Sequence, residues 1–184
     1  MNLEAYRKYF KPSEEYHKEK TNPQMCKACG GDCCKSMGCH IAPDDLMSLS
    51  VSDIISFIDE SGCISIDWWE GNPITNERDN KRYCYLRMRN KNEKVIAPSW
   101  RGECNILTDT GCPLSFEYRP KGARELIPDI DKCNQGYTKQ QCAIDWMQYA
   151  DIIEQVYNHY IELEGEPDMI SNALDGIFGF MGLE

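Results

Sequence analysis

The sequence has no long hydrophobic run. Asp, Ser or Gly interrupts every apolar stretch well before the ~18 consecutive apolar residues that a membrane-spanning helix requires. The N-terminal stretch MNLEAYRKYFKPSEEYHKEK is charged along its length and has no apolar region of the kind found in secretory signals. We therefore expect a cytoplasmic protein that makes no contact with a membrane.

Positive charge is also scarce. Lys and Arg together number 20 and Asp and Glu number 30, so the formal net charge is −10. Because non-specific affinity for nucleic acid comes from Lys and Arg neutralising phosphates, this balance predicts no nucleic-acid partner. The chain also lacks a Ser-His-Asp arrangement, a Walker-type phosphate loop and a GxGxxG strand–turn–helix. These absences exclude the enzyme classes that such motifs identify.

The size and composition are those of one folded domain. The chain has 184 residues, of which 41% are hydrophobic and 27% are charged, and this length is expected to form a single core. We divide the domain into an N-terminal arm (1–25), a cysteine-rich metal-binding core (26–136), a long helix (138–164) and a C-terminal segment (167–184).

Cysteine, in contrast, is abundant. The 11 Cys make up about 6% of the chain, below the ~8–10% that is typical of small secreted disulfide scaffolds, and a cytosolic protein would keep them as thiols. Five of them fall between Cys26 and Cys39, where even spacing along the chain would place about one. A cluster this dense needs a chemical explanation.

The strongest motif is Cys26-x2-Cys29-x3-Cys33-Cys34. A C-x2-C pair on a tight turn directs two sulfurs toward one ion, and two further sulfurs can complete a tetrahedral shell or a cluster corner. Thiolates prefer zinc, iron–sulfur iron or copper(I) to magnesium or calcium. We therefore predict metal binding here; the alternatives are a redox thiol pair and unliganded structural thiols.

The later cysteines are isolated, like ligands that a fold brings together. No second C-x2-C follows at the spacing of a simple zinc ribbon, which excludes that fold. Cys104 and Cys112 flank the turn at 108–111 and are expected to complete the first site or to build a second one. His40 is either a ligand or a hydrogen-bonding group at the start of a helix. The second tier of possible ligands comprises Cys39, His40, Cys133 and Cys142.

Hydrophobic periodicity predicts an α+β fold with a short antiparallel sheet. Apolar and polar residues alternate over 63–68 and 84–89, as they do in half-buried strands. Within these strands we interpret Cys63 and Cys84 as core residues. The segment that carries Val95 and Ile96 is expected to continue the sheet as a meander.

Helices are expected before and after the strands in the sequence. The N-terminal arm favours a short helix, Pro43 favours a helix over the residues that follow it, and Ser52 is the expected N-cap of the next one. Thr138 and Gln141 have capping-box spacing at the start of the long amphipathic helix over 138–164. The segment 167–184 is expected to form a smaller helix, which either packs on the long helix or docks a protein partner.

Two groups of residues, a tryptophan pair and a pair of arginines, each have two interpretations. Trp68 and Trp69, with Glu70, either line a pocket or belong to the core. Arg119 and Arg124 either form a clamp near the metal or make a structural ion pair.

Two segments, CKACGGDCC at 26–34 and CNILTDTGCPLSFEYRP at 104–120, resemble the YkgJ-like CxxCxxCC family of zinc- or iron-chelating domains. In that family a cysteine cluster is typically followed by a cysteine, a short turn, another cysteine and an Arg-Pro pair. The resemblance covers roughly 26–124 and implies a small intracellular domain with a cysteine-bound metal. Some larger relatives look like the flagellin lysine N-methylase, which implies iron–sulfur chemistry in part of the family. By this match, the first candidate ligands are Cys26, Cys29, Cys33, Cys34, Cys104 and Cys112.

The chain departs from the family pattern in two places. Many members have a cysteine shortly after the Arg-Pro pair, where this chain has Ala123, which cannot bind a metal. Cys133 or Cys142 replaces that ligand, or the site is smaller. The spacing from Cys29 to Cys33 is also one residue longer than in the stricter form of the motif.

Three functions follow from these patterns. The first is a cytoplasmic metal-binding protein that holds zinc or an iron–sulfur cluster through its clustered cysteines. The second is an iron–sulfur-dependent redox or protein-modifying enzyme, which requires an open coordination position or a substrate pocket. The third is a metal-delivery or partner-binding module that uses the C-terminal segment. The C-x2-C motif serves both zinc and iron–sulfur sites, so the spacing leaves the metal open.

Overall fold

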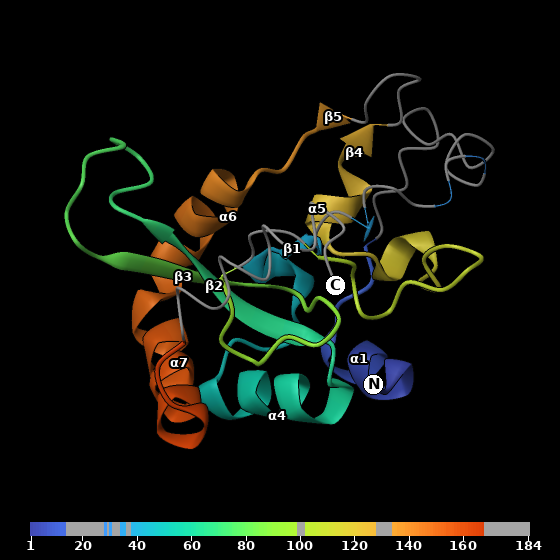
Figure 1. Cartoon of the computed structure of the whole chain (residues 1–184), viewed down its shortest axis with the longest axis horizontal. Helices are drawn as coiled ribbons and strands as arrows, with labels where there is room; N and C mark the ends of the chain where they lie inside the picture. Colours follow the sequence, from blue (N-terminus) through green and yellow to red (C-terminus); the bar gives the residue numbers. More distant parts are fainter. Residues whose placement is uncertain are drawn as a thin grey trace, which may run out of the picture.

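The computed structural model describes residues 1–13, 28, 30, 34–35, 38–98, 102–127 and 134–167. Within these ranges the fold is α+β (Figure 1). The strands are β1 (His40–Ile41), β2 (Ile64–Glu70), β3 (Arg82–Met88), β4 (Leu126–Ile127) and β5 (Asn134–Gln135). The α-helices are α1 (Leu3–Tyr9), α4 (Val51–Ser61), α5 (Lys121–Arg124), α6 (Lys139–Trp146) and α7 (Ala150–Glu164). Short 3₁₀ turns are η2 (Pro43–Asp45), η3 (Phe116–Tyr118) and η4 (Met147–Tyr149).

The central sheet has three antiparallel strands in the order β1-β3-β2, and β4 and β5 form a separate two-stranded sheet. Both strands predicted from alternation are confirmed as β2 and β3. The expected meander is wrong in direction, because Ile96 bridges Ile66 in a parallel sense. After β3 the chain crosses the end of the sheet and runs along the outer edge of β2, so it cannot continue as a hairpin.

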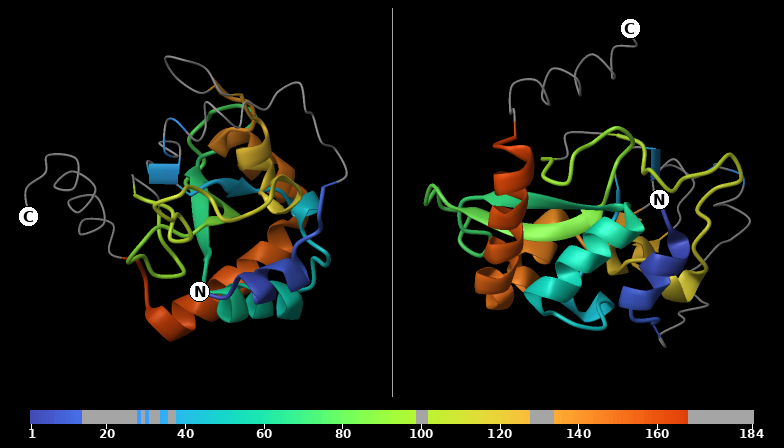
Figure 2. Two further views of the ribbon diagram at one scale, coloured as in Figure 1. Left: turned by 90° about the vertical axis from the view of Figure 1, so that its right-hand side faces the viewer. Right: turned by 90° about the horizontal axis from the view of Figure 1, so that it is seen from below.

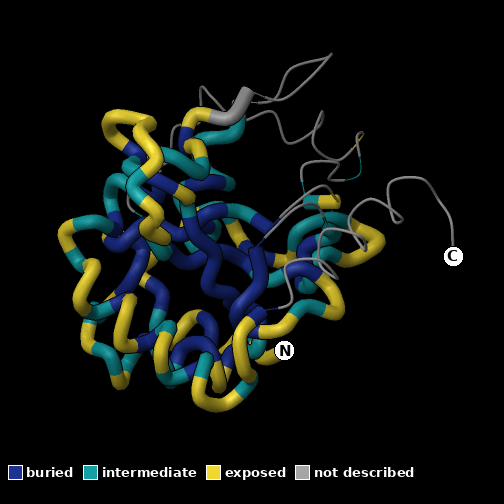
Figure 3. The backbone as a smooth tube through the Cα atoms, turned by 60° about the vertical axis from the view of Figure 1, so that its left-hand side comes forward, coloured by how far each residue is buried: buried dark blue, intermediate teal, exposed yellow. Residues whose placement is uncertain are grey.

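One face of the sheet is apolar and packs against α4 and α7. Trp68 of β2 meets the ring of Tyr157 of α7 edge to face, with centroids 6.4 Å apart. Figure 1 shows α4 and α6 on opposite sides of the sheet, and Figure 3 shows the buried backbone concentrated in the middle of the molecule. The buried side chains that the register aligns on the apolar face are Ile41, Ile64, Ile66, Trp68, Leu86 and Met88.

The opposite face of the sheet carries the polar side chains of Ser65, Asp67 and Arg87, which are also buried. Arg87 has no exposed side-chain surface, and its guanidinium pairs with Asp67 at 3.2 Å and with Glu93 at 2.8 Å. It also donates to the carbonyl of Ala97 at 2.8 Å. Lys139 of α6 reaches Asp67 at 3.4 Å. The charges on this face are therefore neutralised by one another rather than by water.

The two helices expected between the N-terminal arm and the sheet differ from the structure. After Pro43 only one 3₁₀ turn forms, because Leu46 is extended and bridges Phe10. The N-cap of α4 is Ser50, whose hydroxyl accepts from Asp53 N–H, and not Ser52. Gly62 terminates this helix, and its φ of 64° is one that residues with a side chain rarely adopt.

The long C-terminal helix is broken into two. Thr138 caps α6 by accepting from Gln141 N–H, as predicted, but the 3₁₀ turn η4 separates α6 from α7. The indole of Trp146 donates to the carbonyl of Ile41 at 2.9 Å, whereas Tyr160 near the other end donates to Asp59 of α4 at 2.7 Å. One straight helix could not meet both sides of the sheet, and Figure 2 shows the change in direction. The helix expected within 167–184 lies outside the described residues beyond Pro167.

No helix within the described residues is both long enough and apolar enough to cross a bilayer.

We expect the substitution Arg87→Met to lower the free energy of unfolding by about 3–5 kcal/mol, because it leaves the buried Asp67 with Lys139 alone and removes the cation that faces the partly exposed Glu93. Lys8→Met is the matched control, since Lys8 pairs with Glu60 at an exposed site where water screens the charges, and its loss should change the stability little. Urea unfolding of both variants measures the difference. Equal losses would contradict a structural role for the buried pair.

Candidate functional site

Four of the predicted ligands lie outside the described residues: Cys26, Cys29, Cys33 and Cys133. Their positions relative to the fold are therefore not part of the geometry that follows. The described candidates are Cys34, Cys39, His40, Cys104, Cys112 and Cys142.

Cys34 and Cys104 come together through the backbone. The amide N–H of Cys104 donates to the carbonyl of Cys34 at 2.7 Å, and Cys104 also forms an antiparallel bridge with Asn90 just beyond β3. A residue of the first motif thus lies beside a residue of the second, although the two are far apart in the sequence. This contact brings the segment of Cys104 against the N-terminal cysteine motif; whether it completes the first site or builds a second one stays a prediction.

Cys112 lies close to Cys104 because a tight turn separates them. The backbone groups of Thr108 and Gly111 bond to each other in both directions, at 3.1 and 2.9 Å, and the Thr108 hydroxyl donates to Gly111 at 2.8 Å. The pKa of Cys104 is raised to about 12, first by burial and in smaller part by the neighbouring Cys112. The predicted hairpin turn is confirmed.

Other thiols gather around the buried ring of Tyr6. The pKa of Tyr6 is well above its usual value, first because of burial and then because of Asp45, Cys63, Cys112 and Cys39. The thiol region, defined here as Cys34, Cys39, Cys63, Cys104 and Cys112, therefore occupies one end of the sheet beside α1.

Cys63 is the member of the thiol region that the sequence did not identify as a candidate ligand. The prediction of a core position, made because isolated cysteines are often buried, is confirmed for Cys63, which is fully buried. Burial raises the pKa of its thiol, which adds a proton-bearing sulfur next to Cys104. Among the described residues alone, no three ligating side chains converge as a metal site.

His40 lies on the polar face of the sheet, opposite Arg87. It pairs with Arg87 in the register, is fully buried, and meets the ring of Tyr85 edge to face at 5.6 Å. Burial lowers its pKa to about 4, so the ring is neutral. Within the described part of the chain neither ring nitrogen has a partner at normal hydrogen-bond geometry; the Tyr137 backbone lies near enough only to favour the protonated ring weakly. His40 therefore begins a strand and does not cap a helix.

Cys142 lies on α6 and has a hydrogen-bond partner on β1. Its thiol donates to the carbonyl of Ile41 at 3.4 Å, and burial raises its pKa well above the usual value. A protonated thiol that donates to a backbone carbonyl is not arranged as a metal ligand. The same carbonyl accepts from Trp146, so Cys142 belongs to the contact between α6 and β1.

The segment after the Arg-Pro pair is held by structural contacts. Arg124 pairs with the buried Asp45 at 2.9 Å, and Arg119 donates to the carbonyl of Leu114 at 3.1 Å. Helix α5 covers the outer edge of β1, and a Cβ on Gly122 would lie 2.8 Å from the backbone nitrogen of His40. In the described structure these arginines make a structural ion pair and a carbonyl contact, without a sulfur among their partners.

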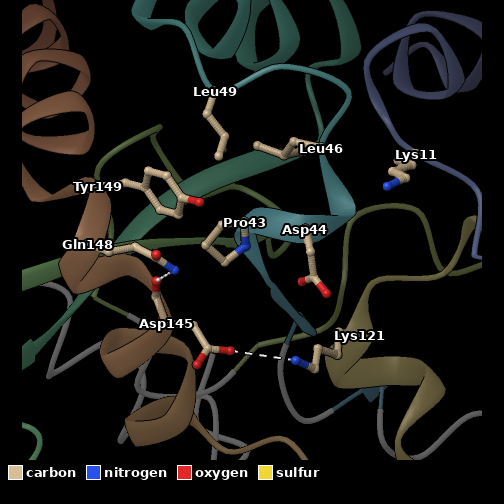
Figure 4. A pocket seen from close by; sticks show the side chains of 9 residues that line it. All are labelled: Lys11, Pro43, Asp44, Leu46, Leu49, Lys121, Asp145, Gln148 and Tyr149. Carbon is tan, nitrogen blue, oxygen red and sulfur yellow. Dashed lines mark hydrogen bonds and ion pairs between the residues drawn. The ribbon is translucent and has the colours of Figure 1, made fainter.

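A surface pocket lies away from the thiols, between η2, α5 and the end of α6 (Figure 4). It has a volume of about 390 Å³ and is lined by Lys11, Pro43, Asp44, Leu46, Leu49, Lys121, Asp145, Gln148 and Tyr149. Lys121 points toward Asp145 across its floor, with Nζ and Oδ2 3.6 Å apart. None of these lining residues carries a thiol, so the pocket itself offers no ligand that a soft metal prefers.

The variant Cys142→Ala separates a ligand from a structural thiol. We expect it to leave metal content unchanged and to lower the free energy of unfolding by about 1–2 kcal/mol, the loss of one hydrogen bond and a small volume of core. Metal analysis and urea unfolding of the same sample check this. A fall in bound metal in this variant would return Cys142 to the ligand set.

No family model, curated protein or solved structure matches this chain. Its function has to be inferred from its own residues.

Proposed function

We propose that this protein binds a metal, as zinc or as an iron–sulfur centre, through its clustered cysteines in the cytoplasm. The observation that carries the proposal is the backbone bond from Cys104 to Cys34, with Cys112 across a tight turn from Cys104. This contact joins the two cysteine motifs of the chain. The ligands proposed first are those of the two motifs: Cys26, Cys29, Cys33, Cys34, Cys104 and Cys112.

The chemistry of the donor set favours this proposal. Burial raises the pKa values of Cys63 and Cys104, which means that desolvation disfavours their thiolates in the metal-free chain. A soft cation offsets that penalty, because each thiolate then binds a positive charge instead of facing apolar surroundings. Cys104, which is buried beside the backbone of Cys34, is therefore unsuited to be a free reactive thiol, and a bound soft cation would stabilise its thiolate.

The metal would also stabilise the fold. Structural zinc contributes about 10–16 kcal/mol in small peptides, which is comparable with the ~5–15 kcal/mol net stability of a typical domain. Cys34 and Cys104 join segments that are otherwise held mainly by loop hydrogen bonds. Metal loss is therefore expected to loosen the contact between the two motifs.

The first experiment is anaerobic purification of the full chain, followed by iron, acid-labile sulfide and zinc analysis with a visible absorption spectrum. We expect at least one equivalent of zinc, or matched iron and sulfide, in each molecule. Protein that holds neither, and takes up neither zinc nor iron with sulfide on reconstitution, would overturn the proposal.

We expect Cys34→Ser and Cys104→Ser each to reduce the bound metal to less than about half and to lower the melting temperature, because serine oxygen is a poor ligand for a soft metal. Cys84→Ser is the matched control: Cys84 lies in the middle of β3, outside the thiol region, so this variant should keep its metal. Full metal and unchanged melting in both test variants would remove these two residues from the site.

A further inference from the structure

Asn90 lies where the two cysteine motifs meet. It follows β3 directly and is almost completely buried. Its side-chain oxygen accepts from the backbone N–H of Gly38 at 2.8 Å, next to Cys39, and its own backbone bridges Cys104. We propose that Asn90 is a positioning residue that holds the segment before β1 against the segment at Cys104, and so sets the spacing of their thiols. This inference rests on the proposed metal site.

The first segment has little freedom to move away from Asn90. A Cβ on Gly38 would lie 1.9 Å from the carbonyl oxygen of Met88, so only glycine allows this approach. The next residue is fixed as well, because Met88 N–H donates to the carbonyl of Cys39 at 2.8 Å. The amide of Gly38 is thereby aimed at the Asn90 side chain, and a displaced Asn90 would displace Cys39.

The second segment packs on Asn90 from the other side. Lys91 N–H donates to Glu103 at 2.7 Å, and Asn105 N–H donates to Arg89 at 2.9 Å, so the chain around Cys104 pairs with the residues around Asn90. A Cβ on Gly102 would lie within 2.8–2.9 Å of the Asn90 side chain. Both cysteine-bearing segments thus approach the same amide group at close range.

Glu93 fixes the orientation of that amide. Its carboxylate accepts from the Asn90 side-chain nitrogen at 2.7 Å and from the Asn90 backbone N–H at 3.0 Å. A carboxylate can only accept, so the amide nitrogen must face Glu93 and the amide oxygen must face Gly38. Glu93 in turn pairs with the buried Arg87. The orientation of Asn90 is therefore tied to the charge network of the sheet.

This arrangement suits a residue that supports metal ligands without touching the metal. Groups that orient ligands typically change metal affinity by about 10–100-fold when they are removed. Asn90 also offers a test that ordinary core packing does not, because its contact with Glu93 has a defined donor and a defined acceptor. Exchanging the donor and the acceptor between positions 90 and 93 should restore the hydrogen bond.

The test uses Asn90→Asp, Glu93→Gln and the double variant of the full chain. Asn90→Asp keeps the bond from Gly38 but places two carboxylates against each other. In Glu93→Gln alone, the new amide nitrogen replaces one of the two carboxylate oxygens. It then faces Asn90 or Arg87 nitrogens that are themselves donors, so a hydrogen bond is lost. In the double variant the new carboxylate at position 90 accepts from both Gly38 and the glutamine amide, and one negative charge remains beside Arg87. Asn92→Asp, exposed and two residues away, is the matched charge control.

The measurements are the Zn²⁺ dissociation constant, from competition with a chromogenic chelator, and the visible spectrum of the Co²⁺-loaded protein. We expect each single variant to raise the dissociation constant at least about tenfold and to alter the Co²⁺–thiolate bands. The double variant should return to within about threefold of the parent, and Asn92→Asp should match the parent throughout. Urea unfolding without metal records any purely structural loss.

The outcomes separate the inference from the proposed function. A parent chain that binds neither Zn²⁺ nor Co²⁺ and contains no iron overturns both. A parent that binds metal, with single variants that bind it equally well, overturns only the role of Asn90. Weakened single variants that the double variant does not rescue also overturn it. If Asn90→Asp does not fold, recovery from Glu93→Gln to the double variant decides the same question.

Discussion

The buried guanidinium of Arg87 is the group on which the arrangement of the sheet depends. A cation without solvent must have its partners in place, because its desolvation costs several kcal/mol when they are missing. Asp67 comes from the adjacent strand, Glu93 from the turn after β3, and the carbonyl of Ala97 from the edge segment that runs along β2. One side chain thus specifies the positions of three separate pieces of chain.

The same network extends to the thiols. Glu93 contacts both Arg87 and Asn90, and Asn90 contacts the segments on either side that carry Cys39 and Cys104. The end of the sheet that carries the cysteines is therefore not an independent loop region. Its geometry is linked, one hydrogen bond at a time, to the charged interior of the domain.

Local patterns predicted the elements better than their assembly. Alternation over 63–68 and 84–89 indicated β2 and β3, and the Thr138 cap was correct, because these signals depend on near neighbours. Alternation also suggested that Asp67 and Arg87 would face solvent, since a half-exposed antiparallel sheet has one polar face. Their burial depends on charges supplied from Glu93 and Lys139, which no local period reveals. The break at η4 likewise depends on tertiary contacts, in which Trp146 donates to the carbonyl of Ile41 and Tyr160 donates to Asp59 of α4.

The candidate site likewise combines features that the local sequence suggested with features that depend on tertiary structure. The two motifs suggested that Cys104 and Cys112 would complete the first site or build a second one, whereas the place of His40 opposite Arg87 follows from the register of β1 with β3. That two-residue strand has a further consequence for the order of events during synthesis. Its edge is closed by Gly122 of α5 and by Trp146 of α6, both encoded far downstream. The cysteines of the first motif therefore leave the ribosome long before the elements that cover β1 exist, and folding must wait for contacts of high sequence separation.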